Sequence, residues 1–487
     1  MATPRLSSHY LVSRLLVSLF LVCLLLLFGG ARAALACGCS MGNCSGCACG
    51  CGGEGTGGGL GNPNPAAAGS NFNSQNVTLA SWLPLDQIGG AGKVGSAIWG
   101  WTDAGDNNRE YALYGLSNGT AFIEVTDPFN PRYLGMMATQ TGESVWRELQ
   151  TYNDHLYVVS DANGGHGMQV FDLKNLRSVG ATPATFAPTF VYGGVSNVHT
   201  LTINTSTGYA YLNGSSDAQQ VVSLLNPAQP VKVASYGRDG YTHDSTVVSY
   251  RGPDATYAGR EIAINYNGTS GIAIVDMTDK ANITTIKTVS YPGLGYGHQG
   301  AITEDQRFLL VDDEFDELNN AGDPAMRTKT HVWDIRDLDN PVWLGAFTHE
   351  GNAIDHNMFI RGDLVYQSNY TSGLRVFRLG DLQSIADAIA ANPLLVNDQA
   401  LLGTSLVSLG FFDTYPQDDA SPEVSFNGQW GNYPFFPSGT VIAGDRNNGL
   451  FVFAAAVPEP PTLALAALGG VAALLGGSGA LRKRNAG

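Results

Sequence analysis

Short stretches in which hydrophobic and polar positions alternate recur along most of the chain. One copy is residues 271–276, Gly-Ile-Ala-Ile-Val-Asp, and similar stretches occupy residues 121–127, 167–172, 330–334, 373–377 and 449–453. Alternation of this length predicts a short β-strand. Several copies are followed by Asp-x-x-x-Pro and a second apolar stretch, as in residues 127–135 and 337–345. Because Pro and Asn favour turns, the pattern predicts small antiparallel units repeated along the chain.

The repeats can be counted from the strand that begins each unit. Seven such starts are found, at residues 98–101, 145–148, 198–201, 242–245, 297–300, 355–358 and 429–431. Most are followed by a hairpin partner, then by the repeated alternating stretch, then by an outer strand. A period of about fifty residues with four strands per unit is typical of propeller blades. The sequence therefore predicts an all-β, seven-bladed β-propeller over residues 72–456.

The two ends of this region complement each other. The seventh unit stops at residue 453 without an outer strand, whereas residues 77–83 have the pattern of an outer strand with nothing before them. We expect residues 77–83 to pair beside residues 449–453 and close the ring, which leaves no large open sheet edge. An Ala-rich stretch at residues 384–391 predicts a surface helix inserted in the sixth unit, ended by Pro393.

The amino-acid composition agrees with an all-β propeller, and the net charge argues against nucleic acid as a partner. The 487 residues include 61 Gly and 22 Pro, and 14% are charged, as suits a turn-rich all-β protein. The formal net charge is −16. No basic run occurs before the extreme C-terminus, so nucleic acid is not an expected partner.

The N-terminal segment predicts export. Arg5 and Arg14 precede the apolar run 15–28, and small residues follow, so residues 1–36 form an expected signal peptide. Residues 37–71 form a Gly-rich linker that contains Cys37, Cys39, Cys44, Cys47, Cys49 and Cys51. Three interpretations of these cysteines stay open: a disulfide-linked or disordered tether, lipidation at Cys37, or binding of a soft metal.

The C-terminal segment, residues 457–487, has three parts. Pro458, Glu459 and Pro460 precede the apolar run 462–481, which is long enough to span a bilayer, and Arg482, Lys483 and Arg484 follow it. One interpretation is a plain membrane anchor with the basic residues on the cytoplasmic side. The order of the three parts also resembles the PEP-CTERM sorting signal of Gram-negative bacteria, which implies processing by an exosortase. Either interpretation predicts a protein of the cell envelope or the extracellular space.

Candidate chemistry gathers where the inner strands begin. Four of the seven start at a histidine (His199, His243, His298 and His356), and the other three carry tryptophan (Trp99 or Trp101, Trp146 and Trp430). Inner strands surround the axis of a propeller, so these positions should converge there. With neighbouring Asp244 and Asp355, the imidazoles can hold a divalent metal such as Zn, Fe, Cu or Ni. The alternative is that they fill a polar tunnel through hydrogen bonds alone.

A run of carboxylates follows one predicted strand. Asp312, Asp313 and Glu314 begin the stretch 312–317, in which five of six residues are acidic. Such a density of like charge is unfavourable unless a cation is near. A calcium-type oxygen site and a solvated acidic loop are both consistent with it, and the spacing does not match an EF-hand.

Several ordered blocks resemble one family. They are residues 241–244 (Tyr-Thr-His-Asp), 296–300 (Tyr-Gly-His-Gln-Gly), 312–314, 355–357, 369–375, 411–416 and 426–430. Together they resemble the choice-of-anchor B family of LVIVD-repeat β-propellers, over about residues 82–453. The resemblance implies a propeller at the cell surface and assigns no activity or catalytic residue.

Three functions are consistent with these observations. The first is a surface binding or matrix-interaction module that recognises a glycan or protein of the envelope at its axial face. The second is a metal-dependent enzyme, in which the axial histidines hold the metal and Asp244, Asp312 or Glu314 assists. The third is a structural protein stabilised by calcium.

Overall fold

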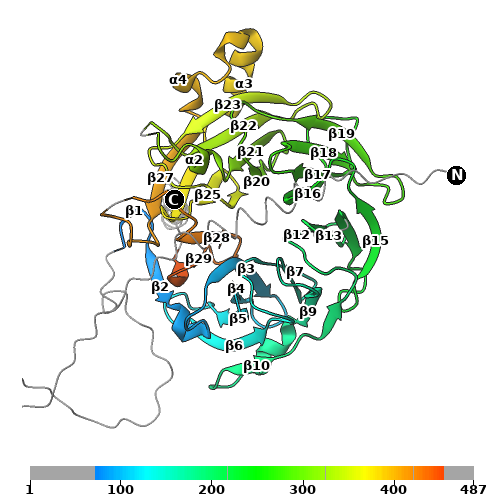
Figure 1. Cartoon of the computed structure of the whole chain (residues 1–487), viewed down its shortest axis with the longest axis vertical. Coiled ribbons are helices and arrows are strands. Elements are labelled where there is room, and N and C mark those ends of the chain that lie inside the picture. Colours follow the sequence, from blue (N-terminus) through cyan, green and yellow to red (C-terminus); the bar gives the residue numbers. More distant parts are fainter. Residues whose placement is uncertain (1–71, 216–217, 324, 421, 455–487) are drawn as a thin grey trace, which may run out of the picture. The chain divides into compact units, whose positions relative to one another are not determined.

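The computed structural model describes residues 72–215, 218–323, 325–420 and 422–454. Within that part of the chain, the strands form seven sheets around a central axis (Figure 1). The prediction of a seven-bladed β-propeller is confirmed. The expected signal peptide, the cysteine-containing linker and the C-terminal signal lie outside the described residues. Within the described ranges, no helix is long and apolar enough to cross a membrane.

The first four blades follow each other in chain order from the innermost strand outward. Blade 1 contains β3 (Gly95–Asp103), β4 (Arg109–Leu116), β5 (Gly119–Glu124) and β6 (Arg132–Ala138). Blade 2 contains β7 (Arg147–Tyr152), β8 (His155–Ser160), β9 (Met168–Asp172) and β11 (Phe190–Tyr192). Blade 3 contains β12 (Thr200–Asn204), β13 (Tyr209–Asn213), β14 (Gln219–Ser223) and β15 (Val231–Tyr236). Blade 4 contains β16 (Asp244–Ser249), β17 (Glu261–Tyr266), β18 (Ile272–Asp276) and β19 (Thr284–Val289).

The remaining three blades complete the ring. Blade 5 contains β20 (Gly297–Ile302), β21 (Phe308–Asp313), β22 (Lys329–Asp334) and β23 (Val342–Thr348). Blade 6 contains β24 (Met358–Arg361), β25 (Leu364–Ser368), β26 (Leu374–Leu379), β27 (Leu406–Phe412) and the short β1 (Ser74–Gln75). Blade 7 contains β28 (Gln429–Tyr433), β29 (Val441–Asp445), β30 (Gly449–Phe453) and β2 (Leu79–Leu83). The innermost strands β3, β7, β12, β16, β20, β24 and β28 contact one another in succession around the axis.

The N-terminal strand closes the ring as the sequence predicts. Strand β2 pairs antiparallel with β30, with Leu79 opposite Phe453 and Trp82 opposite Phe451. The ring of Trp82 stacks on Phe451 at 6.0 Å, and its Nε1 donates a hydrogen bond to the carbonyl of Asn448 at 2.7 Å. The last blade is therefore built from both ends of the propeller.

The core consists of apolar layers between neighbouring blades. One layer packs Ile98 and Tyr114 of blade 1 against Ile442 of blade 7, and another packs Ile264 of blade 4 against Leu309 of blade 5. Each sheet is thus buried on both faces, which explains why many strands are buried at every position.

Two segments depart from the simple repeat. The outer strand of blade 2 was not located in the sequence; it is the short β11, while β10 (Ala184–Phe186) pairs parallel with β6 of blade 1. The helix expected at residues 384–391 is α3 (Leu382–Ala391), which begins after the capping side chain of Asp381. Its buried face, including Ile385 and Ile389, packs against the outer strands of blades 5 and 6.

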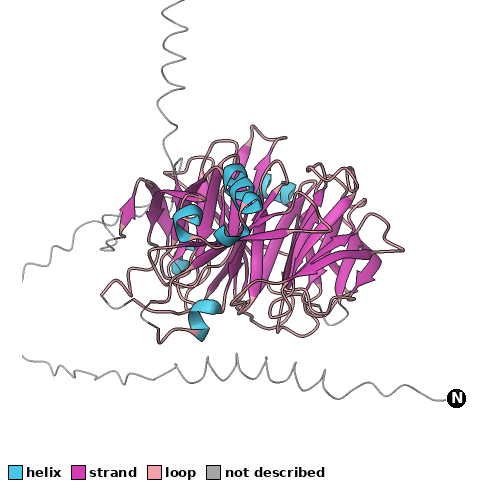
Figure 2. Ribbon diagram, turned by 90° about the horizontal axis from the view of Figure 1, so that it is seen from above, coloured by secondary structure: helices cyan, strands magenta, loops and turns pink. Residues whose placement is uncertain are grey.

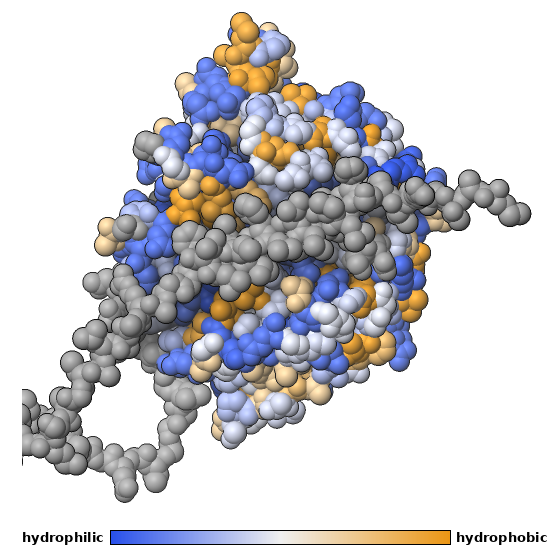
Figure 3. Space-filling view, in the orientation of Figure 1, coloured by the Kyte–Doolittle hydropathy of each residue, from blue (hydrophilic) through white to orange (hydrophobic). Residues whose placement is uncertain are grey.

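The other helices of the described residues are short. They are η2 (Leu85–Ile88), η3 (Leu173–Ser178), α2 (Asp316–Asn319), η4 (Pro393–Leu395) and α4 (Gln399–Leu402) (Figure 2). On the face seen in Figure 3, hydrophobic residues are interspersed among hydrophilic ones, and one group lies at the tip of the projection that carries α3. Leu394 in η4 is 91% exposed.

Candidate metal centre on the propeller axis

Four histidines from successive blades form a row near the axis. They lie at the beginning of the innermost strands of blades 3 to 6, beside β12, β16, β20 and β24. Neighbouring ring centroids are 4.3 Å apart for His199 and His243, 4.6 Å for His243 and His298, and 4.2 Å for His298 and His356. The convergence expected from the repeat is therefore present. His243, His298 and His356 are only 4%, 3% and 3% exposed, so little water reaches their imidazoles. The side chain of His199 is 15% exposed.

Each of these imidazoles is held through its Nδ1 atom. The partners are Asp161 Oδ2 for His199 at 3.0 Å, the Tyr296 hydroxyl for His243 at 2.9 Å, Asp312 Oδ1 for His298 at 3.2 Å, and the Trp430 carbonyl for His356 at 2.5 Å. A carboxylate or carbonyl only accepts, so in three of the four the hydrogen lies on Nδ1. In these three histidines the Nε2 atom carries the lone pair that a metal uses. The Tyr296 hydroxyl can donate or accept, so Nε2 of His243 carries the lone pair when that hydroxyl accepts from Nδ1.

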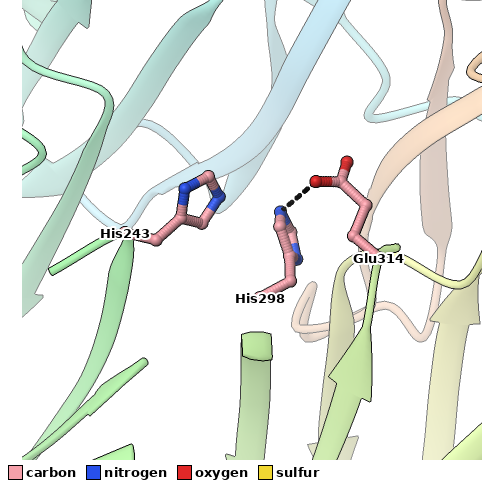
Figure 4. A group of neighbouring side chains, drawn as sticks. All are labelled: His243, His298 and Glu314. Atoms are coloured by element: carbon pink, nitrogen blue, oxygen red, sulfur yellow. Dashed lines mark ion pairs between the residues drawn. The ribbon is translucent and has the colours of Figure 1, made fainter. Parts of the chain in front are cut away.

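Glu314 brings a carboxylate to this row. It directly follows β21, and its Oε2 lies 4.0 Å from His298 Nε2 while its Oε1 lies 3.6 Å from His356 Nε2. One ligand atom each from His243, His298 and Glu314 lies within 4.8 Å of the others (Figure 4). Nε2 of His243 is buried and has no hydrogen-bond partner in the part of the chain that the structure describes. We call His243, His298 and Glu314 the axial set. Their donor atoms are close enough together for one metal ion to bind all three.

The electrostatics of the row favour neutral imidazoles. Burial lowers the pKa of His243 and His298 well below its ordinary value, and lowers the pKa of His356 to about 3. His199 differs: burial also lowers its pKa, but the hydrogen bond and charge of Asp161 outweigh this and raise it. Burial raises the pKa of Glu314 to about 7, against the opposing effect of its hydrogen bond with Tyr370. Neutral imidazole is the form that binds metals.

The other predicted carboxylates occupy supporting positions. Asp312 accepts from the Gln299 amide at 2.8 Å and orients His298. Asp244 accepts from the Ser245 amide at 2.7 Å, and burial raises its pKa to about 6. Asp313 is bonded to other groups: its two oxygens accept from the Tyr296 and Gly295 backbone amides and the Tyr291 hydroxyl. Asp355 is buried beside α2 and belongs to a different group of carboxylates.

The tryptophans divide into two pairs. Trp146 and Trp430 belong to one hydrophobic cluster beside the axial histidines. The ring of Trp430 packs edge-on against that of His356, with centroids 4.8 Å apart. Trp99 and Trp101 do not reach it, contrary to expectation. Strand β3 begins at Gly95, earlier than predicted, so these two residues lie farther along the strand, where Trp99 packs on Tyr433 and Trp101 stacks on Tyr111.

Three residues of the site were not found from the sequence. They are Asp161, Tyr296 and Tyr370, which bond His199, His243 and Glu314. A signal for one of them is present, since Tyr241 and Tyr296 each stand two residues before an axial histidine. Asp161 and Tyr370 carry no such signal, because each reaches the site from the loop of a different strand.

Comparison with known proteins adds little to this geometry. No protein-family model matches the chain, and no curated protein matches it. Among solved structures it is similar to hydrazine synthase of Kuenenia stuttgartiensis, with 12% identity, a TM-score of 0.49, and coverage of 71% of this chain and 93% of that chain. It is also similar to U3-55K, with 10% identity, a TM-score of 0.47, and coverage of 74% and 95%. Likeness at this level supports no statement about function.

Proposed function

We propose that this chain is an exported metal-dependent enzyme that holds one divalent transition-metal ion on the propeller axis through His243, His298 and Glu314. The observation that carries the proposal is His243: its Nε2 is buried with no hydrogen-bond partner among the described residues, and one of its ring nitrogens lies within 4.8 Å of donor atoms from His298 and Glu314. A buried polar atom left without a partner costs about 1–3 kcal/mol, and a bound ion removes that cost.

The alternative, in which the histidines only fill the axis, accounts less well for the bonding pattern. A packing histidine gains most when both ring nitrogens are bonded. Here the Nδ1 atoms are each bonded, while the Nε2 atoms of His298 and His356 lie 4.0 Å and 3.6 Å from oxygens of Glu314. Bonding of one ring nitrogen to fix the tautomer, with the other left for the metal, is the usual arrangement at metal sites.

The donor set indicates the kind of metal and chemistry. Two imidazoles and one carboxylate are the set of zinc hydrolases and of non-haem iron oxygenases, and both leave coordination positions open. A bound ion would supply Lewis acidity and a water of lowered pKa. Tyr370 holds Glu314 in place through a hydrogen bond of 2.9 Å. His199, whose ring centroid lies 4.3 Å from that of His243, would bind substrate beside the axial set.

A second candidate function is the surface binding module, in which a glycan or protein ligand occupies this face. Partly exposed aromatic residues border the axial set and favour it. Tyr296 stacks on Phe315 at 4.7 Å, and Phe315 packs on Phe426 at 6.2 Å. Aromatic faces of this kind can bind the apolar face of a sugar ring.

Location and sorting belong to the same proposal. The apolar leader, the Pro-Glu-Pro segment and the final basic residues support export, processing by an exosortase, and residence in the envelope. The ordered blocks support membership of the choice-of-anchor B family, with the C-terminal signal as the anchor. Labelling of intact and lysed cells with an antibody to the propeller would test the location.

The metal proposal is tested by elemental analysis of the purified protein. We expect about one transition-metal ion per chain, lost in His243→Gln and His298→Gln. His349→Gln is the matched control, since His349 is also buried but bonds Thr330 in blade 5. Absence of any transition metal from the wild type, after incubation with zinc or iron(II), would contradict the proposal. Retention of the metal with no turnover of any hydrolase or oxygenase substrate, together with glycan binding, would favour the second candidate.

A further inference from the structure

Three carboxylates outside the axial set lie together where α2 meets the segment that joins blades 5 and 6. Asp316 and Glu317 belong to α2, which follows β21, and Asp355 precedes β24. One oxygen atom from each lies within 4.8 Å of the others. Asp316, Glu317 and Asp355 are only 4%, 0% and 1% exposed, so water does not screen their charges.

Most of these oxygens have no partner. No hydrogen bond of normal geometry from the described residues reaches either oxygen of Glu317, either oxygen of Asp355 or Oδ1 of Asp316, although the Asp316 and Glu317 side chains are close enough to affect each other's protonation. Among the described residues, Lys329 pairs with Asp316 at 3.0 Å, while Glu317 and Asp355 form no ion pair. An unpaired buried carboxylate is among the most costly groups in a protein, and here two are adjacent.

Burial and the neighbouring charges act in the same direction. Burial, and after it the charges of Asp355 and Asp316, raise the pKa of Glu317 far above its ordinary value. Burial, and after it the charges of Asp316 and Asp313, raise the pKa of Asp355. Amides of Asp313 and Asp355 offset part of this effect, but no hydrogen bond of normal geometry reaches either oxygen of Asp355. Bound protons or a bound cation must therefore neutralise part of the negative charge of these three carboxylates.

We propose that Asp316, Glu317 and Asp355 form a buried calcium site, separate from the axial histidines. All of its donors are carboxylate oxygens, which suit hard cations, whereas the imidazoles of the axial set suit transition metals. Three carboxylates that can bind through one or two oxygens match the irregular coordination that calcium accepts. Magnesium usually keeps several waters, and the complete burial of Glu317 leaves little room for them.

The site lies where it can connect two blades. Asp316 is two residues beyond Glu314 of the axial set, and Asp355 directly precedes His356. A calcium ion between them would fix the end of β21 relative to the start of β24. It would also hold the backbone that carries Glu314 and His356 without contacting either.

The test is a calorimetric titration of calcium chloride into the full-length protein after chelator treatment and buffer exchange. We expect one calcium ion per chain, and a melting temperature that rises by at least about 3 °C at saturating calcium. Magnesium chloride at the same concentration should produce a smaller shift. Asp355→Asn and Glu317→Gln should each lose the calcium response.

Two control variants separate this site from others. His243→Gln should retain calcium binding, so failure of the axial site and failure of this one are distinguishable. Asp337→Asn, in the exposed group formed with Asp254 and Asp339, should also retain it. The proposal is overturned if the wild type shows no calcium-dependent shift. It is also overturned if Glu317→Gln is more stable than the wild type whether or not calcium is present, since shared protons would then neutralise the group.

Discussion

The hydroxyl of Tyr370 donates a hydrogen bond of 2.9 Å to Oε1 of Glu314, joining the loop after β25 to the end of β21. Tyr370 is fully buried and has a positive φ of 33°, a backbone conformation that is unfavourable for a tyrosine. Unfavourable backbone geometry of this kind is retained where the surrounding structure requires it, and here it directs the phenol at a candidate ligand.

Replacement of Tyr370 by Phe should weaken metal binding at the axial set about tenfold or more, because Glu314 loses the group that orients it. The backbone and ring packing are kept, so the melting temperature of the metal-free protein should change little. Competition with a chromophoric chelator measures the affinity. Tyr257→Phe is the control, since Tyr257 bonds Asp339 at the surface. Equal affinities in the two variants would mean that Tyr370 does not position Glu314.

We expect Glu148 on β7 to make the free energy of unfolding depend on pH. Burial, and after it the charge of Asp244, raise the pKa of Glu148 from 4.5 to about 8. Between these values the folded protein binds more protons than the unfolded chain, so stability falls as the pH rises through this window. Glu148→Gln removes this dependence, and its advantage over the wild type should grow from pH 5 to pH 8 in urea unfolding. Glu143→Gln, at an exposed site, should follow the wild-type curve. Parallel curves for Glu148→Gln and the wild type would contradict the assignment.

Trp82 secures the closing strand. Trp82→Ala removes its stacking on Phe451, its edge contact with Phe72 at 5.2 Å and its hydrogen bond to Asn448. We expect a loss of about 3–5 kcal/mol in the free energy of unfolding, measured with urea. Leu394→Ala, at an exposed position, should change it by less than about 0.5 kcal/mol. A small effect of Trp82→Ala would mean that β2 does not stabilise the ring.

Gly345 belongs to the outer strand of blade 5, at a bulge beside Val332. Its φ is +137°, and a Cβ there would lie 2.6 Å from Cα of Asn397. Gly345→Ala should therefore lower the free energy of unfolding by about 1–3 kcal/mol or more. Gly351→Ala has open space around it and an ordinary φ, so it serves as the control. Thermal unfolding of the two variants side by side checks the difference.

The sequence predicted features that recur and missed those that occur once. Alternating stretches revealed seven blades because each blade repeats one pattern. Residues 77–83 were matched to β30 because the seventh unit lacked an outer strand and residues 77–83 had the pattern of an outer strand without a unit of their own. The row from His199 to His356 was predicted for the same reason, since equivalent strand positions converge on the axis. The partner of His199 is Asp161, from the preceding blade, and no repeat relates the two. The short β10 was missed because three residues are too few for a periodicity.

The choice of Glu314 over Asp312 and Asp313 depends on local geometry. Alternate residues of a strand share a side, so Asp313 is separated from Asp312 and Glu314. Asp312 and Glu314 differ because Asp312, on β21, bonds Nδ1 of His298, whereas Glu314, just beyond the strand, lies near Nε2. The side to which each acidic side chain points depends on the residue at which β21 ends. The ends of secondary-structure elements can be predicted from a sequence only to within a few residues.

The pairing of β2 with β30 also determines how the ring responds to a pulling force. Leu79 and Phe453 are opposite each other, so the chain enters and leaves this pair at the same end. Tension applied between the two ends would part the hydrogen bonds one after another, as in a zipper, and this needs far less force than shearing them all together. If the propeller is attached at just one of its ends, no tension acts across the β2–β30 pair. Attachment at both ends would make the seventh blade the point where the ring opens first.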